Sequence, residues 1–250
     1  MAQIITIAIQ KGGTGKTTTA AAIAQAAAYK GEKVLAIDLD PQGQFSFTLA
    51  ADTSRPGSYD LLTGTPAAEL IQTGAIDVIP ASWNLSTITS GTGSARRLQK
   101  ALEPIKKDYG LIIIDTPPTG GELQYNALQA ADRLIIPLQA DIYNLQSLYQ
   151  IADTANQIQK SNPALNEIGI IFTMYDGRPL LNRKMRLDII NAAAALGIKY
   201  YGEVRPAIAV REAAAFQQSL FDYAPKSKPA LDYMDIFNTI TGYKYALKES

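Results

Sequence analysis

The amino-acid sequence predicts an α/β fold: one domain over residues 1–250, with a doubly wound, mostly parallel sheet flanked by helices. Short apolar runs typical of strands buried on both faces recur along the chain, and longer helix-like segments separate them. This alternation favours right-handed strand–helix–strand crossovers. Neither a linker-like tract nor a repeat of roughly 20–50 residues divides the chain.

The expected strands are compact apolar runs that are too short for helices. In chain order they lie at 4–9, 33–40, 76–80, 110–118, 133–139 and 168–176. The expected helices lie at 16–30, 94–107, 121–131, 143–160, 180–196 and 229–247. The first helix is rich in alanine, the best helix former, and Gly31 after it suits a C-cap. The Gly-, Ser- and Thr-rich stretch at 85–95 is expected to be a surface loop.

The composition narrows the chemistry that the chain can perform. Hydrophobic residues make up 47% of the chain, enough for a full core, and charged residues make up 18%, which argues against extensive disorder. Because there is no cysteine, disulfides, thiolate nucleophiles and cysteine-held metal clusters are excluded. Because there is no histidine, Ser-His-Asp hydrolysis and histidine bases are excluded too. Lys, Arg, Asp, Glu, hydroxyl and backbone N–H groups remain, with a hard cation such as Mg²⁺.

The charge is balanced overall but unevenly spread. Residues 1–177 carry 12 basic and 16 acidic side chains, a net charge of −4, whereas residues 178–250 carry 11 and 7, a net charge of +4. The basic part is either ordinary surface scatter or a surface that faces a polyanion. The N-terminus has no basic leader, and no stretch approaches the ~20 apolar residues of a membrane span. A cytoplasmic protein is therefore expected.

A candidate phosphate-binding loop, QKGGTGKTT, lies at residues 10–18, after the first expected strand and at the start of the first expected helix. Its glycines allow backbone N–H groups to approach phosphate oxygens closely; they are Gly12, Gly13 and Gly15. The loop departs from the usual pattern because Gln10 stands where a glycine is expected. It also contains a second lysine, Lys11.

The residues after the glycines predict specific contacts with a nucleoside triphosphate. Lys16 is expected to reach the β- and γ-phosphates, Thr17 to bind Mg²⁺, and Thr18 to bond an inner phosphate. Sites of this kind use a further acidic group at the end of a strand, and Asp115 closes the run LIIID. This pattern indicates a nucleotide site at the carboxyl edge of the sheet.

A pair of carboxylates follows the second expected strand. Asp38 and Asp40 are two residues apart, so on an extended strand they share a face. One can reach the water shell of the metal, and the other can orient an attacking water. From the residues alone, either assignment stands.

Three motifs together resemble those of the deviant Walker ATPases of the ParA/MinD group: KGGTGKTT at 11–18, DLDPQG at 38–43 and IIIDTPP at 112–118. Three further segments are similar to the Soj-like branch of ParA chromosome and plasmid partition proteins: RLIIPLQADIYNLQSL, IIFTMYDGRPLL and REAAAFQQSLFDYAPKSKPALDY. The resemblance covers roughly residues 1–240 and implies a P-loop NTPase fold.

The resemblance implies separate roles for the two lysines. Lys16 serves the ATP of its own subunit, whereas Lys11 crosses a dimer interface to the phosphates of the partner's nucleotide, as an arginine finger in trans does. It also implies that Asp40 supports hydrolysis and that Asp38 and Asp115 lie near the metal. The implied ATP contacts are Gly12, Gly13, Thr14, Gly15, Lys16, Thr17 and Thr18, with Met174, Arg205 and Pro206 around the adenine.

The resemblance further implies an ATPase that segregates plasmid or chromosomal DNA. ATP and Mg²⁺ would drive a homodimer that binds DNA without sequence preference on the nucleoid, and a ParB-like centromere-binding partner would stimulate hydrolysis. The candidate DNA surface consists of Arg183, Lys184, Arg186, Arg205, Arg211, Lys226 and Lys228. Such contacts would be to phosphate and therefore sensitive to salt.

The sequence departs from the partition branch at VRPAIAVREAAA, residues 204–215. Ala209 stands where partition proteins often carry a DNA-contacting arginine, and Arg211 lies two residues further on. The alternative function is a MinD-like membrane-associated positioning ATPase, which needs a basic amphipathic C-terminal helix. The tail DIFNTITGYKYALKES is interrupted by Gly242 and has two lysines, so no membrane partner is expected.

Two other relatives of this group are disfavoured by the residues present. A nitrogenase-iron-protein-like reductase would need cluster-binding cysteines, which the chain lacks. A tyrosine-kinase-like relative would need a terminal tyrosine cluster, for which the chain offers Tyr243 and Tyr245.

Overall fold

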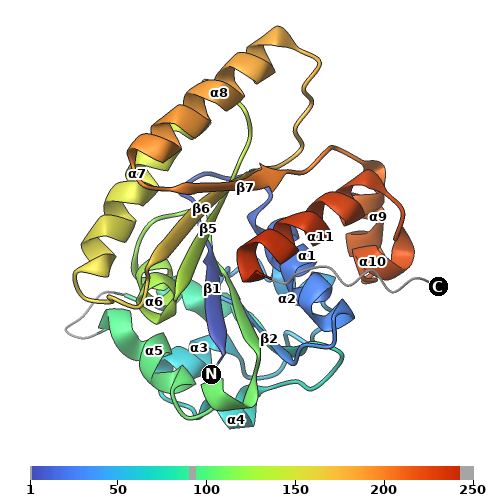
Figure 1. Ribbon diagram of the computed structural model, residues 1–250. Coiled ribbons are helices and arrows are strands. Elements are labelled where there is room, and N and C mark those ends of the chain that lie inside the picture. Colours follow the sequence, from blue (N-terminus) through green and yellow to red (C-terminus); the bar gives the residue numbers. More distant parts are fainter. Residues whose placement is uncertain (1, 90–93, 243–250) are drawn as a thin grey trace.

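The computed structural model describes residues 2–89 and 94–242. Within these residues seven parallel strands form one sheet, in the order β3-β2-β4-β1-β5-β6-β7, with helices on both faces (Figure 1). The α/β fold class predicted from the sequence is confirmed. The strands are β1 Gln3–Ile7, β2 Val34–Asp38, β3 Asp77–Ile79, β4 Leu111–Asp115, β5 Arg133–Leu138, β6 Glu167–Phe172 and β7 Lys199–Glu203.

The helices connect the strands and follow the last one. The α-helices are α1 Lys16–Tyr29, α2 Gln44–Thr48, α3 Ser58–Thr63, α4 Ala67–Leu70, α5 Arg97–Leu102, α6 Glu122–Ala130, α7 Ile142–Gln159, α8 Leu180–Ala195, α9 Ile208–Ala215, α10 Leu220–Tyr223 and α11 Lys228–Thr241. Short 3₁₀ turns lie at Trp83–Thr87, Ser94–Arg96 and Lys106–Asp108. None of the helices in the described ranges is long and apolar enough to cross a bilayer.

Two predicted helices are wrong in their extent. The helix expected over 94–107 is regular only at Arg97–Leu102, because Pro104 has no N–H to donate and disfavours helical backbone before it. The helix expected over 229–247 ends at Thr241, and Gly242 follows with a left-handed φ of 74°. The remaining predicted positions 243–247, with Tyr243 and Tyr245, lie outside the described residues, as do residues 90–93 of the predicted loop.

The two faces of the sheet are covered by different helices, as Figure 1 shows for α1 and α11 on one side and α7 on the other. Alternate residues of each strand point to opposite faces. Ile5 and Ile113 pack with the alanines of α1 and with α11, whereas Ile112 and Ile114 pack with α3, α5 and α6. A third cluster joins β5 and β6 to α7 and α8.

The register of the sheet brings the carboxyl ends of three strands together. Ile7 of β1 and Asp38 of β2 both pair with Asp115 of β4. The segments that follow β1 and β2 therefore begin at one edge of the sheet, next to Asp115. In open parallel α/β sheets this edge is where ligands bind.

Candidate functional site

The loop between β1 and α1 leaves open space beside its backbone, and we call this loop the cradle. Gly13 and Gly15 have left-handed φ angles of 73° and 82°, which residues with a side chain rarely adopt. Apart from the glycine itself and its two chain neighbours, no atom of the described residues lies within 4 Å of the point where a Cβ of Gly12 or Gly13 would be. Thr14 Oγ1 is buried and has no hydrogen-bond partner among the described residues. The cradle thus offers open space beside backbone N–H groups, as a phosphate-binding loop requires.

Two side chains that directly follow the neighbouring strands β5 and β6 anchor the loop. Thr173 Oγ1 donates to the Thr14 carbonyl at 2.7 Å, and Gln139 Nε2 donates to the Gly13 carbonyl at 2.8 Å. Since C=O and N–H point in opposite directions across a trans peptide, the N–H groups of Thr14 and Gly15 face away from these anchors. Neither Thr173 nor Gln139 was predicted as a site residue from the sequence. Their signal was their position, directly after apolar strands.

Lys16 points into the loop. Its side chain is buried, and Nζ donates to the Lys11 carbonyl at 2.7 Å. Burial lowers the pKa of Lys16, while the nearby charges of Asp115 and Asp40 raise it. The carboxylates at the strand ends are thus near enough for their charge to act on the ammonium group, and a polyphosphate would supply further negative charge there.

Lys11 points the other way, out of the loop and toward α7. Its Nζ lies 3.1 and 3.2 Å from the two carboxylate oxygens of Asp141, and 5.6 Å from the centre of the Tyr143 ring. Asp141 also caps α7, because its Oδ1 accepts from the Asn144 N–H at 2.9 Å. The two lysines of one loop thus lie in separate surroundings. Sequence reasoning missed Asp141.

Asp115 lies beneath the loop and is bonded to Thr17. The Thr17 hydroxyl donates to Asp115 Oδ2 at 2.7 Å. Complete burial, reinforced by the charge of Asp38, raises the pKa of the Asp115 carboxyl well above its usual range, and Thr17 and Lys16 oppose this shift. A cation at this point would relieve the repulsion between Asp115 and Asp38. Hydroxyl and carboxylate oxygens are the donors that Mg²⁺ prefers, so these residues fit that ion.

Asp38 and Asp40 have different surroundings. Asp38 Oδ1 accepts from the Asp40 N–H at 3.0 Å, and Oδ2 accepts from the Ser46 N–H at 2.8 Å and the Ser46 hydroxyl at 2.7 Å. Burial raises the pKa of Asp38 to about 6, against the opposing effect of the Ser46 hydrogen bonds. Asp40 Oδ1 accepts from the Gln42 N–H at 3.0 Å. Asp38 therefore has protein donors on both oxygens, whereas a single such bond is made to the carboxylate of Asp40 in the described chain.

The predicted adenine residues surround one cavity. Met174, Arg205 and Pro206 line a hollow of about 510 Å³ together with Gly15 and Thr18 of the loop. Met174 has a left-handed φ of 51°. The cavity therefore adjoins the phosphate cradle, as a nucleoside attached to phosphates would require.

The Arg205 guanidinium is held by Asp232 of α11. Nε and Nη2 of Arg205 donate to the two carboxylate oxygens at 3.0 and 2.6 Å, and its backbone N–H donates to Oδ2 at 2.9 Å. This fork fixes the segment that enters α9.

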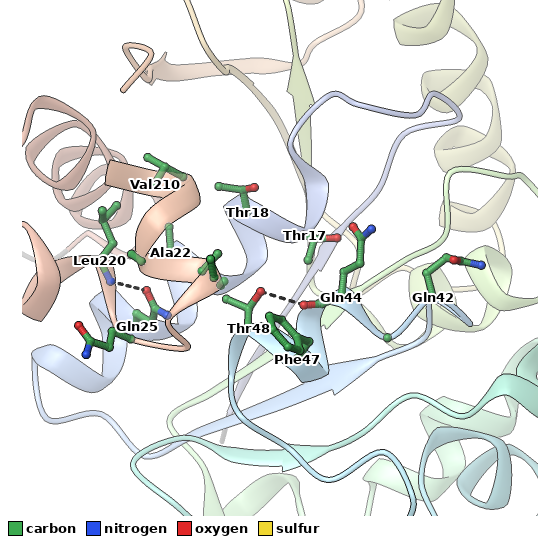
Figure 2. Close-up of a pocket in the computed structure, with 16 residues that line it drawn as sticks. Thr17, Thr18, Ala22, Gln25, Gln42, Gln44, Phe47, Thr48, Val210 and Leu220 are labelled. Carbon is green, nitrogen blue, oxygen red and sulfur yellow. Dashed lines mark hydrogen bonds between the residues drawn. The ribbon is translucent and has the colours of Figure 1, made fainter. Parts of the chain in front are cut away.

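A second cavity of about 440 Å³ lies on the other side of Thr18. Figure 2 shows Thr17 and Thr18 of α1 facing Gln44 and Thr48 of α2 across it. Val210 of α9 lines both cavities, so α9 contributes to the wall of each. The helix α2, which follows Asp40 closely, is thereby part of the wall around the loop.

The seven predicted DNA contacts are divided between two parts of the surface. Arg183, Lys184 and Arg186 belong to α8, and Arg205, Arg211, Lys226 and Lys228 belong to or adjoin α9 and α11, which Figure 1 shows on the far side of β7 from α8. Two of the seven are already paired: Arg186 with Glu203 at 2.6 Å, and Arg205 with Asp232. In the described ranges, the other five have no ion pair and are exposed: Arg183, Lys184, Arg211, Lys226 and Lys228.

Comparison with known proteins identifies a family that matches this chain. Residues 2–167 match the family described as AAA domain. The chromosome partitioning protein ParA of Caulobacter vibrioides is 37% identical over 248 residues, which cover 94% of this chain and 92% of that protein. The chromosome-partitioning ATPase Soj of Thermus thermophilus is 36% identical over 233 residues, which cover 92% of this chain and 91% of that protein.

A solved structure extends the likeness to three dimensions. Cobyrinic acid a,c-diamide synthase from Mycobacterium smegmatis, with a bound ATP analogue and magnesium, superposes with a TM-score of 0.79 at 28% identity. The alignment covers 96% of this chain and 95% of that one.

Proposed function

Because the chain belongs to the AAA-domain family, in the ParA/Soj group of P-loop ATPases, we propose that it binds ATP with Mg²⁺ and hydrolyses ATP to ADP and phosphate. Beyond this, we propose that it acts in DNA partition as an ATP-dependent homodimer. Support for nucleotide binding comes from the cradle, from the buried lysine beside it, and from the adjoining cavity. Support for the partition role comes from the similarity to ParA and Soj.

The chain's own residues would divide the work of hydrolysis. The N–H groups of the loop and Lys16 would neutralise the phosphates, and Met174, Arg205 and Pro206 would enclose the adenine. Thr17 and Asp115 would hold Mg²⁺, which supplies charge neutralisation at the phosphates. Asp40 would orient the attacking water, because its carboxylate is the less engaged of the pair after β2.

The proposal of a dimer rests on one observation: Lys11 lies in the loop but points away from it, to Asp141 and Tyr143. A second cation that served the same phosphates would be expected to face them. A cation directed outward can reach the phosphates of a second subunit instead, in the manner of an arginine finger. Dimerisation and completion of the catalytic site would then be one event.

The DNA-binding role is proposed for the surface around α9 and α11. Arg211, Lys226 and Lys228 are exposed there, and a dimer would double the surface and so strengthen weak phosphate contacts. DNA binding would place the protein on the nucleoid in the cytoplasm. A ParB-like centromere-binding partner would stimulate hydrolysis and thereby cause release of the DNA. No described feature favours the MinD-like alternative, which needs a basic amphipathic C-terminal helix; residues 243–250 of the tail lie outside the described residues.

Light scattering at fixed protein concentration tests the proposal. We expect the mass of a monomer with ADP, that of a dimer with ATP and Mg²⁺, and a larger species when duplex DNA of random sequence is added to the ATP form. The DNA-bound species should dissociate as salt is raised. A mass that does not respond to the nucleotide would refute the dimer. A dimer that leaves DNA free at low salt would refute the DNA surface.

A further inference from the structure

Ser46, in the middle of α2, is a fully buried hydroxyl whose hydrogen-bonding direction is fixed. Its Oγ accepts from the Ala81 N–H at 2.9 Å and lies 2.7 Å from Asp38 Oδ2. Because a backbone N–H can only donate, Ser46 Oγ is the acceptor in the first contact. Its single proton therefore goes to the carboxylate of Asp38.

Asp38 passes this restraint on to the next carboxylate. Its second oxygen, Oδ1, accepts from the Asp40 N–H at 3.0 Å. The turn after Asp40 is closed by two further bonds to that residue, from the Gln42 N–H to Oδ1 at 3.0 Å and from the Gly43 N–H to the carbonyl at 2.9 Å. The backbone of Asp40 is thus held on one side by Asp38 and on the other by the turn that enters α2.

We propose that Ser46 is a positioning residue for hydrolysis: it orients Asp38, and Asp38 fixes the backbone from which the Asp40 carboxylate projects. Ser46 touches neither phosphate nor adenine positions, because it lines neither of the two cavities beside Thr18. Its effect is therefore on turnover and not on nucleotide affinity. This inference rests on the proposed ATPase function, and within it assigns Asp38 a structural task besides its place near the metal.

The test is Ser46→Ala in the full-length chain, with kcat and ATP affinity measured separately. The substitution removes the proton given to Asp38 and the acceptor used by Ala81. A misplacement of the catalytic group by about 1 Å lowers kcat by about 10- to 100-fold. We expect a fall of that size, with the affinity for a fluorescent ATP analogue within about twofold of wild type. Ser46→Cys has a similar size and a much weaker donor, so it gives the same result if the alanine variant does not fold.

Ser58→Ala is the matched control. Ser58 is also fully buried, its hydroxyl donates to the Ile79 carbonyl at 3.5 Å, and it has no bond to Asp38 or Asp40. Its kcat and affinity should both stay at the wild-type level. An equal loss of kcat in Ser58→Ala would mean that general weakening of this part of the sheet is responsible, and would overturn the proposal.

A double variant separates positioning from a structural role. If Ser46 acts through Asp40, adding Ser46→Ala to Asp40→Ala lowers the residual kcat no further. A further loss equal to that in the wild-type background would overturn the proposal. The proposal would also be overturned if the kcat of Ser46→Ala were within twofold of wild type, or if this variant lost ATP affinity in parallel with kcat. If the wild-type chain itself does not hydrolyse ATP, the proposed function fails first, and that outcome is distinct from all of these.

Discussion

The ion pair between Lys11 and Asp141 must break before Lys11 can serve a second subunit, so its removal should favour the dimer. Asp141→Asn is a suitable perturbation because asparagine caps helices as well as aspartate does. The bond from the Asn144 N–H to this side chain, 2.9 Å long, can therefore persist. The charge opposite Lys11 is lost, together with one acceptor oxygen, Oδ2, which also accepts from the Asn144 side-chain amide at 2.6 Å.

The exposure of the two side chains sets the size of the expected effect on stability and on dimerisation. The two side chains are 29% and 37% exposed, so the pair belongs among partly solvated ion pairs, which contribute about 0.2–1 kcal/mol. The monomer should lose that amount, and its Tm should fall by no more than about 2–4 °C. Since the pair no longer has to be broken, ATP-dependent dimerisation should gain up to about fivefold per subunit, or up to about 25-fold when both subunits exchange partners.

Sedimentation equilibrium with ATP and Mg²⁺, in an Asp40→Ala background that slows hydrolysis, measures this change. Asp153→Asn is the matched control, because Asp153 lies on the exposed face of α7, the helix that Asp141 caps, and bonds Gln157 instead of Lys11. Both variants change the net charge equally. If Asp141→Asn dimerises no more tightly than Asp153→Asn, the pair does not restrain Lys11 and the reasoning is refuted.

The remaining predictions concern the nucleotide and the DNA surface. Lys16→Ala removes the buried cation of the cradle and should weaken ATP binding by at least about 100-fold in a fluorescence titration; wild-type affinity would contradict the loop assignment. Asp40→Ala should keep ATP affinity but lower kcat by about 100-fold or more, so that ATP dimers persist, and normal steady-state turnover would exclude the water-positioning role. Lys226→Glu should weaken DNA binding in gel shifts at several salt concentrations and leave basal ATPase activity intact, because Lys226 is exposed and lines neither cavity. Arg55→Glu, an exposed control elsewhere, should leave both DNA binding and ATPase activity unchanged.

The fold could be predicted from the sequence wherever burial on both faces leaves a continuous apolar run. LIIID in β4 is such a run, and every one of its residues is buried. The strand β7, KYYGE, was missed because it lies at the edge of the sheet, is partly exposed and contains Gly202, so it shows no such run. The helices α2, α3, α4, α9 and α10 were missed because each is eight residues or shorter and depends on packing against neighbouring helices.

The site could be predicted where a residue type is dictated by local chemistry, as with the glycines of the cradle and Lys16. Contacts made between distant segments could not be predicted. Thr173 is 159 residues from the carbonyl that it anchors, and Asp141 is 130 residues from Lys11. A single sequence does not show which distant segments come to lie next to each other at the ends of the strands. The DNA residues gathered by composition alone lie on two separate surfaces for the same reason.

A complementation assay tests most directly whether Lys11 and Lys16 serve nucleotides in two different subunits. Lys11→Ala and Asp40→Ala should each have little ATPase activity alone. In a mixed dimer, the site of the Lys11→Ala subunit keeps its own Lys16 and Asp40 and receives Lys11 from the other subunit. An equal mixture should therefore recover roughly a quarter of the wild-type rate, since half of the dimers are mixed and each has one complete site. If the mixture hydrolyses ATP no faster than the two variants measured separately, Lys11 acts within its own subunit and the account is contradicted.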